Sequence, residues 1–201
     1  MTQEVNQNFT MPRGKALWAN LQAPDTKFNP DGVYRIDVVL EATSDPAKNL
    51  KRRIDQAFEQ NLEYQSINKS GVKPSVHFPY KDEEDQDGNP TGNLIFKTKT
   101  SATRPTARGR VPHRPKVFSR SGQPLDQEVG NGSEVAVNVT MRGHNKGTNG
   151  AGVTLYLEAV MVYELVPVGD RSAEEYGFEV EQDEIEEAFN DAAEGDEIIP
   201  F

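Results

Sequence analysis

A run of cations that contains no acidic residue is the strongest chemical signal in the sequence. Its members are Lys97, Lys99, Arg104, Arg108, Arg110, Arg114, Lys116 and Arg120. Eight cations held close together repel one another unless anions lie among them. The run therefore predicts a surface that binds a polyanion, with a solvated basic loop as the alternative. The glycine and the three prolines within it predict a mobile, extended loop.

Three aromatic residues are placed where they could add base stacking to this attraction. In the segment 17–21 the two leucines and Ala19 share one face of a strand, so Trp18 points the other way. Tyr156 has the same relation to its apolar neighbours, and Phe118 lies between Lys116 and Arg120. Cations that hold phosphates and rings that stack on bases are the combination that binds single-stranded nucleic acid. Burial in the core is the alternative for each ring.

A glycine-rich segment, 143–152, lies between two expected strands and predicts a long flexible hairpin. It is not a phosphate-binding loop, because no Gly-Lys-Ser/Thr follows and the next element is a strand. Arg142 and Lys146 lie beside this hairpin and could reach the same ligand. The expected nucleic-acid contacts are Trp18, Lys97, Lys99, Arg104, Arg108, Arg110, Arg114, Lys116, Phe118, Arg120, Arg142, Lys146 and Tyr156.

Alternation of apolar and polar residues dominates the rest of the first 165 or so residues and predicts strands. Strands are expected over 17–21, 33–40, 94–100 and 134–142. The last strand, about 153–165, is expected to bury Val153, Leu155, Leu157, Ala159, Met161 and Tyr163.

One helix is marked by its start and by its apolar stripe. Ser44 or Asp45 can cap it, and Pro46 suits its first turn. The stripe consists of Leu50, Ile54, Ala57, Phe58 and Leu62. Five or six strands with one helix predict an all-β protein built as a small antiparallel barrel or sandwich. For a protein that binds nucleic acid, an OB-fold-like barrel is the natural candidate.

The charge of the chain changes sign along its length. Residues 170–201 hold 13 acidic residues and one basic residue, a net charge of −12, whereas residues 1–169 carry a net charge of +2. Such a tail is too charged to build a core, so 1–169 is expected to be the folded domain and 170–201 a disordered acidic tail. The opposite charges predict a polyanion site with a competitor on the same chain.

The tail ends in an apolar cap, Ile198-Ile199-Pro200-Phe201, directly after Asp196 and Glu197. A terminal ring and a free carboxylate beside acidic side chains suit a peptide that docks into an apolar pocket rimmed by Lys or Arg. We therefore expect Asp196, Glu197, Ile198, Ile199, Pro200 and Phe201 to bind partner proteins. An unused, frayed terminus is the alternative.

This ending resembles the C-terminal peptide of bacterial single-stranded-DNA-binding proteins, although Ile198 stands where that family usually has another Asp. In that family the peptide recruits replication, recombination and repair proteins and competes with DNA for the protein's own basic groove. The layout of the whole chain resembles that of the replication single-stranded-DNA-binding proteins of short-tailed bacteriophages. This resemblance implies a phage protein with an OB-fold, and a monomer or a homodimer formed by tail exchange. Its implied partners are single-stranded DNA and a polymerase, primase-helicase or nuclease.

Several other classes of protein lack support in the sequence. There is no cysteine, so disulfides and Cys-ligated metals are excluded, and His77, His113 and His144 lack metal-ligand spacing. The acidic run 82–87 has Leu94 where a calcium loop needs a bidentate Glu. No apolar run near 18 residues and no signal peptide is present. We expect a cytoplasmic protein (in the host cytoplasm, if viral) that uses no metal or cofactor and is not an enzyme.

Two other functions remain open at this point. The chain could be an interaction protein or DNA mimic whose negative tail occupies the nucleic-acid site of another protein. It could also be a nuclease that uses the carboxylates of 82–87 with a metal ion, although no nucleophile motif supports an enzyme.

Overall fold

The computed structural model describes residues 6–27, 29–66, 76–145 and 150–169, without the side chains of 61–66 and Asn145. Lys146 and the tail 170–201 lie outside the described residues, so what the sequence predicts for them stays a prediction. The described chain forms one helix, α1 (Asp45–Ser66), and eleven strands: β1 (Asn6–Thr10), β2 (Gly14–Asp25), β3 (Val33–Glu41), β4 (Val76–His77), β5 (Tyr80–Glu84), β6 (Pro90–Ser101), β7 (Thr103–Thr106), β8 (Gly109–Pro112), β9 (Lys116–Ser119), β10 (Glu134–Asn145) and β11 (Ala151–Glu164).

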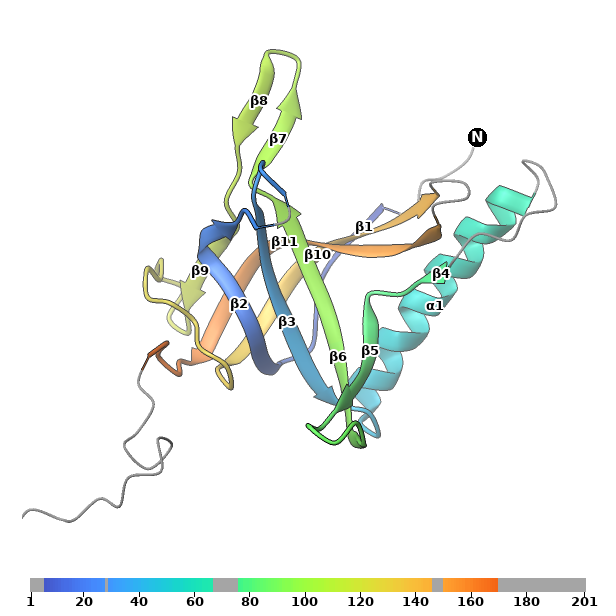
Figure 1. The fold of residues 1–201 in the computed structure, drawn as a ribbon, viewed down its shortest axis with the longest axis horizontal. Coiled ribbons are helices and arrows are strands. Elements are labelled where there is room, and N and C mark those ends of the chain that lie inside the picture. Colours follow the sequence, from blue (N-terminus) through green and yellow to red (C-terminus); the bar gives the residue numbers. More distant parts are fainter. Residues whose placement is uncertain (1–5, 28, 67–75, 146–149, 170–201) are drawn as a thin grey trace, which may run out of the picture. The chain divides into compact units, whose positions relative to one another are not determined.

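Five of these described strands close a barrel in the order β2, β3, β6, β11, β10 and back to β2 (Figure 1). This closed ring is OB-fold-like and confirms the predicted class, all-β with one helix. The barrel is antiparallel at every junction apart from one. There, Leu155 and Tyr156 of β11 pair in parallel with Thr98 and Lys99 of β6. Strands joined by a long connection are free to pair in parallel, which the expectation of a purely antiparallel barrel left out.

Strand β11 pairs with four other strands along its two edges. One edge follows β10 along its whole length, and the other meets β4, β6 and β9 in succession. At the β4 junction the chains come so close that a Cβ on Gly152 would lie 2.1 Å from the carbonyl oxygen of His77. Glycine is therefore required where β11 starts.

The predicted alternation is confirmed in β3, β6 and β10. The inward positions form the core, and they are Tyr34, Ile36, Val38, Leu40, Leu94, Phe96, Thr98, Val135, Val137, Val139 and Met141. The outward positions of the same strands carry the exposed cations Arg35, Lys97, Lys99 and Arg142, and also the buried residues Asp37, Ile95, Ala136 and Thr140. A single inserted residue would reverse this arrangement, so the unbroken period fixes which side chains point into the core.

Helix α1 begins as predicted. The backbone N–H of Ala47 donates to Ser44 Oγ at 3.3 Å, so Ser44 is the cap. Leu50, Ile54 and Ala57 are buried where the helix packs against β3, β10 and β11. Among the described residues, no helix is long and apolar enough to cross a membrane.

The burial pattern predicted for the last strand is wrong beyond Leu157. Leu157 pairs with Val139 and Ala159 pairs with Asn138, so Glu158 is an extra residue that forms a β-bulge. The bulge reverses the alternation, and the buried residues that follow are Val160 and Val162. Ala159, Met161 and Tyr163 are only half-buried.

The mobile loop predicted from the glycine and the prolines of the cationic run is also wrong. Lys97 and Lys99 belong to β6, in the strand that the sequence predicts over 94–100, whereas the next segment forms the β7–β8 hairpin, and Lys116 and Phe118 lie on β9 (Figure 1). The prolines do not prevent this, because these strands are short and lie at sheet edges, where a missing N–H is tolerated. Because of these short strands, the described residues form eleven strands, more than the five or six that the sequence predicts.

Barrel closure gives a test at the junction of β2 with β10, where Gly14 pairs with Val135. A Cβ on Gly14 would lie 2.4 Å from the carbonyl oxygen of Val39. Gly14→Ala is expected to lower the free energy of unfolding by about 1–3 kcal/mol, measured by denaturant titration. The exposed neighbour Lys15 provides the control, since Lys15→Ala should change it by less than about 0.5 kcal/mol. Equal stability of the two variants would contradict the close packing.

Candidate nucleic-acid interface

A groove of about 700 Å³ lies over the barrel wall formed by β2, β3, β6 and β11. The segment 77–81, the connection between β2 and β3, and His144 of β10 also contribute to its lining. OB-folds bind oligonucleotides on the face of their second and third strands, which are β3 and β6 in this barrel. The lining includes four cations and three exposed rings: Arg35, Lys81, Lys97, Lys99, Trp18, Phe78 and Tyr156.

Trp18 reaches the groove through a bulge in β2. Leu17 pairs with Asp37 of β3, whereas Asn20 pairs with Arg35, so three steps along β2 match two along β3. Trp18 has a φ of 49°, in the left-handed region that bulky residues rarely adopt. Its backbone N–H leaves the ladder and donates to Asn131 Oδ1 at 2.8 Å. Strain of this kind, of order 1–3 kcal/mol, is found where a side chain serves function.

The alternation predicted for 17–21 is therefore wrong, although its conclusion about Trp18 holds. The bulge changes the parity of the strand, so Ala16 and Leu21 are the buried residues and Leu17 is half-buried. Trp18 is 47% exposed because the bulge turns it outward. A ring of this size left in solvent beside cations is available to stack on a base.

The groove cations come from three strands that pairing brings together. Arg35 of β3 pairs with Lys99 of β6, two positions along from the pair formed by Asp37 and Lys97. Lys81 of β5 lies with its Nζ 6.0 Å from the centre of the Trp18 ring. All four cations are exposed, so they can meet phosphates without a large desolvation cost.

Tyr156 is on β11, which pairs with the edge of β6 opposite to β3. Tyr156 pairs with Lys99 across the parallel junction, and its side chain is 37% exposed. The guanidinium of Arg142, on β10, lies 5.5 Å from the centre of its ring. Two of the predicted stacking residues and three of the predicted cations, Lys97, Lys99 and Arg142, are thus in or beside one groove.

Asp37 is one of two acidic residues in the groove lining, the other being Asp25. Asp37 is only 8% exposed and lies on the groove wall beside Lys97. Burial raises the pKa of Asp37 from 3.8 to about 6, against the lowering effects of Lys97, Arg35, the backbone N–H of Thr98 and Lys81. The ionised carboxylate therefore lowers the free energy of unfolding.

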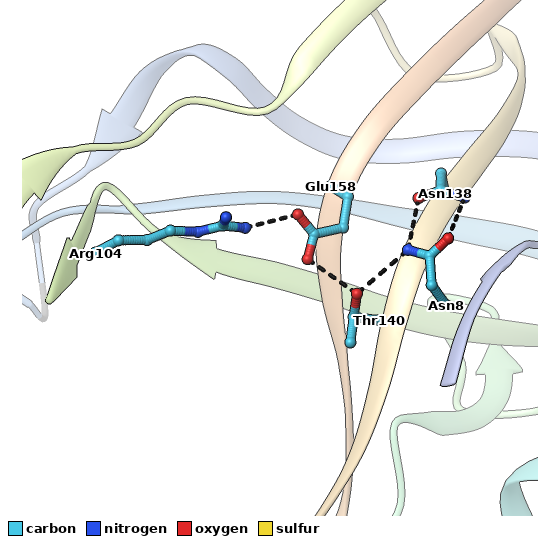
Figure 2. A network of polar contacts seen from close by, with 5 residues as sticks. All are labelled: Asn8, Arg104, Asn138, Thr140 and Glu158. Carbon is cyan, nitrogen blue, oxygen red and sulfur yellow. Dashed lines mark hydrogen bonds and ion pairs between the residues drawn. The ribbon is translucent and has the colours of Figure 1, made fainter. Parts of the chain in front are cut away.

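The other predicted cations among the described residues do not line the groove. Arg104 projects from β7 to Glu158, the bulged residue of β11, and its Nη2 lies 2.6 Å from the carboxylate (Figure 2). Glu158 also accepts a hydrogen bond from Thr140, and Asn8 links Thr140 to Asn138 across β1 and β10 (Figure 2). The network ties the base of the β7–β8 hairpin to the barrel, and it already balances the charge of Arg104.

The hairpin and the segment that follows it are fixed by further contacts. Arg110 forms an ion pair with Asp31 at 3.0 Å, and Arg114 donates to the carbonyl oxygen of Leu21 and to Gln22. The remaining predicted contacts outside the groove lining are Arg108, Lys116 and Arg120, which are exposed, and Phe118, which is half-buried. Asp31 follows Asn29, a lining residue, so the hairpin stands beside one end of the groove.

Sequence reasoning missed Arg35, Lys81 and Phe78 as lining residues. Arg35 carried a usable signal, because it alternates outward in a strand whose other face is apolar. Lys81 and Phe78 carried no such signal in the sequence, since only the pairing of β5 with β6 brings the segment that contains them to the groove. Phe78 is 38% exposed and its ring stacks on Tyr80 with centroids 5.2 Å apart.

The carboxylates of 82–87 do not assemble a metal site. Within the described part of the chain, no three His, Asp or Glu side chains are grouped so as to hold a metal ion. Asp85 instead accepts hydrogen bonds from the backbone N–H groups of Asp87 and Asn89, which shape the turn between β5 and β6. The expected acidic turn is therefore present.

No family model matches the sequence, and no curated protein matches it. Solved structures do match. The crystal structure of gp2.5, a single-stranded DNA binding protein encoded by bacteriophage T7, is similar with a TM-score of 0.67 and 23% identity. The match covers 89% of this chain and 97% of that chain.

A second similar structure is the single-stranded DNA-binding protein from bacteriophage Enc34 in complex with ssDNA. Its TM-score is 0.58 with 17% identity, and the match covers 81% of this chain and 89% of that chain. The likeness is one of fold. It confirms, at that level, the resemblance to phage single-stranded-DNA-binding proteins that the sequence indicates.

The buried carboxylate of Asp37 gives a stability test. Because its pKa is higher in the folded than in the unfolded chain, the folded state binds the proton more tightly. Its contribution to stability is therefore fully present below about pH 4 and is lost as pH rises through about 6. Asp37→Asn is expected to raise the free energy of unfolding by up to about 3 kcal/mol at pH 7.5, and by less than about 1 kcal/mol at pH 4.

Denaturant titrations at both pH values measure this difference. Asp82→Asn, which removes an exposed carboxylate from β5, serves as the control and should change stability by less than about 0.5 kcal/mol. A loss of stability in Asp37→Asn at pH 7.5 would show that the ionised carboxylate stabilises the fold.

Proposed function

We propose that this chain binds single-stranded DNA without sequence specificity and is not an enzyme. The observation that carries the proposal is the exposed Trp18, held at an unfavourable φ on the wall of a groove with four cations. A protein that needed only a stable barrel would gain by placing glycine or a polar residue at this bulge. The ssDNA complex of the Enc34 protein, which shares the fold, supports the same ligand class.

Within the groove we assign two kinds of contact. Lys97, Lys99, Arg35 and Lys81 bind phosphates, and Trp18 and Tyr156 stack on bases, with Arg142 beside Tyr156. Stacking on each ring is worth about 1–3 kcal/mol and accepts any base, which suits binding without sequence specificity. The exposed cations beyond the groove, from Arg104 to Arg120, add electrostatic attraction for the same strand. We assign the same role to Lys146 from the sequence alone.

The acidic tail, residues 170–201, is the second part of the proposed function. We assign it two roles: it competes with DNA for the cationic groove, and its last six residues dock on proteins of DNA replication, recombination or repair. The support is the net charge of −12 beside a body of +2, and the apolar ending Ile199-Pro200-Phe201. A tail of this kind lowers binding of weak anions and yields to a polynucleotide.

The same tail favours one other candidate, an interaction protein or DNA mimic. In that case its charge would occupy the nucleic-acid site of another protein, and the barrel itself would not bind DNA. The two functions separate cleanly, because only the first requires the groove to bind DNA after the tail is removed.

Removal of the stacking rings tests the groove. Fluorescence anisotropy with labelled oligo-dT should show that Trp18→Ala and Tyr156→Ala each weaken binding by about 5- to 150-fold, while duplex DNA binds poorly. Tyr163→Ala, which removes a half-buried ring that lies outside the groove lining under Arg13, is the control and should bind like the parent protein. Affinity should also fall with salt, with a slope of about −0.7 per phosphate neutralised. Parent-like binding by both groove variants would remove the basis of the proposal.

Deletion of residues 170–201 tests the tail. The truncated protein is expected to bind oligo-dT about tenfold more tightly at low salt, because an internal anionic competitor is gone, and to lose binding to replication proteins. Deletion of Phe201 alone keeps the acidic side chains, so it should abolish the protein contacts and leave DNA affinity unchanged. Unchanged affinity of the truncated protein at low salt would rule out competition, and no DNA binding by either form would favour the DNA mimic.

A further inference from the structure

Asp37 is a carboxylate within a groove that the proposed function fills with a polyanion. It is more than nine-tenths buried, and it shares the groove lining with Trp18 and Lys97. In the described part of the chain it forms no ion pair, and the hydrogen bond that it accepts comes from the backbone N–H of Thr98. Burying an ionised group without an ion pair is costly, so the position calls for an explanation.

The depths of the groups in the groove limit what can approach Asp37. Lys97, Lys99, Arg35 and Lys81 are exposed, whereas Asp37 is buried beside them. A phosphate is attracted to the exposed cations and repelled by the carboxylate. The part of a nucleotide that fits against Asp37 is therefore the base.

Base edges offer this carboxylate suitable donors. In a single strand the Watson–Crick edge is free, and the amino group of cytosine is a known partner for Asp and Glu. Uracil presents an imino donor flanked by two carbonyl oxygens, which repel a carboxylate. Trp18 follows Leu17, the residue that pairs with Asp37, so a base stacked on the Trp18 ring would bring its edge near the carboxylate.

We propose that Asp37 accepts a hydrogen bond from the amino group of a base held on Trp18, and so gives the groove a preference for cytosine over uracil. This inference rests on the proposed function and deepens it. The preference concerns the composition of the strand, since it involves one base contact, and does not amount to recognition of a sequence.

Charge balance is the competing explanation for Asp37. If its only role were to offset the repulsion between Arg35, Lys81 and Lys97, its removal would strengthen the binding of every oligonucleotide by the same factor. A base contact predicts an additional change that depends on the base. Comparison of two bases in the same variant cancels the general electrostatic effect.

The experiment measures dissociation constants for oligo-dC and oligo-dU of equal length at pH 7.5 and fixed salt. These strands differ only in the hydrogen-bonding edge of the base. The full chain is expected to bind oligo-dC about fivefold more tightly, which is the lower end of the discrimination found for one base contact. In Asp37→Asn, both strands should bind more tightly and the ratio should fall below about twofold. Asp82→Asn removes the same charge away from the groove lining and should keep the fivefold ratio.

Two results would overturn the inference: no preference in the full chain, or the same preference in Asp37→Asn. Either result leaves the proposed function intact, because both strands would still bind. Failure of the proposed function is distinct, since neither strand would then bind the full chain or the chain without residues 170–201. Loss of folding is not expected to obscure the result, because removal of the buried charge should stabilise the variant.

Discussion

The pairing of β11 along both of its edges is the interaction on which the groove depends. One edge follows β10, and the other brings β4, β6 and β9 to the same strand in succession. The short parallel contact with β6 closes the barrel and also places Tyr156 beside Lys99. The same pairing thus closes the barrel and assembles the site. If β11 and β6 were separated, Tyr156 would no longer lie beside Lys99.

Two of the register shifts in this barrel turn a side chain out of the regular pattern. The bulge in β2 turns Trp18 into the groove, and the bulge in β11 turns Glu158 toward Arg104. Each costs a ladder position, and the first also places a bulky residue at positive φ. One bulge supplies a ring for the ligand, and the other fixes the hairpin that stands beside the groove.

The sequence predicts the regular parts of the fold well and the bulges not at all. Strands β3, β6 and β10 keep an unbroken period of two, and α1 has a polar cap before an apolar stripe, so their buried faces follow directly. A bulge adds one residue without a compositional mark, which is why burial in β2 and after Leu157 was assigned to the wrong residues. Lys97 and Lys99 share an outward face for the same reason that Phe96 points inward.

The remaining cations show the limit of reading a charged run as one site. Residues adjacent in sequence separate when β6 ends at Ser101 and the chain turns into the β7–β8 hairpin. Arg35 and Lys81, distant in sequence, join the groove only through the pairing of β3 and β5 with β6. The spacing of the residues indicates that Trp18 and Arg35 point outward, but that they and Lys81 share one groove is a property of the pairing, which neither the composition nor the spacing shows.

Trp18 is the only tryptophan of the chain, so its fluorescence reports on the central claim without any substitution. In a titration with unlabelled oligo-dT, stacking on the indole is expected to quench its emission, with saturation at the concentration where anisotropy also saturates. Duplex DNA at the same nucleotide concentration should leave the emission nearly unchanged. Full binding of oligo-dT by anisotropy, with no change in Trp18 emission, would contradict a groove that binds single strands through this ring.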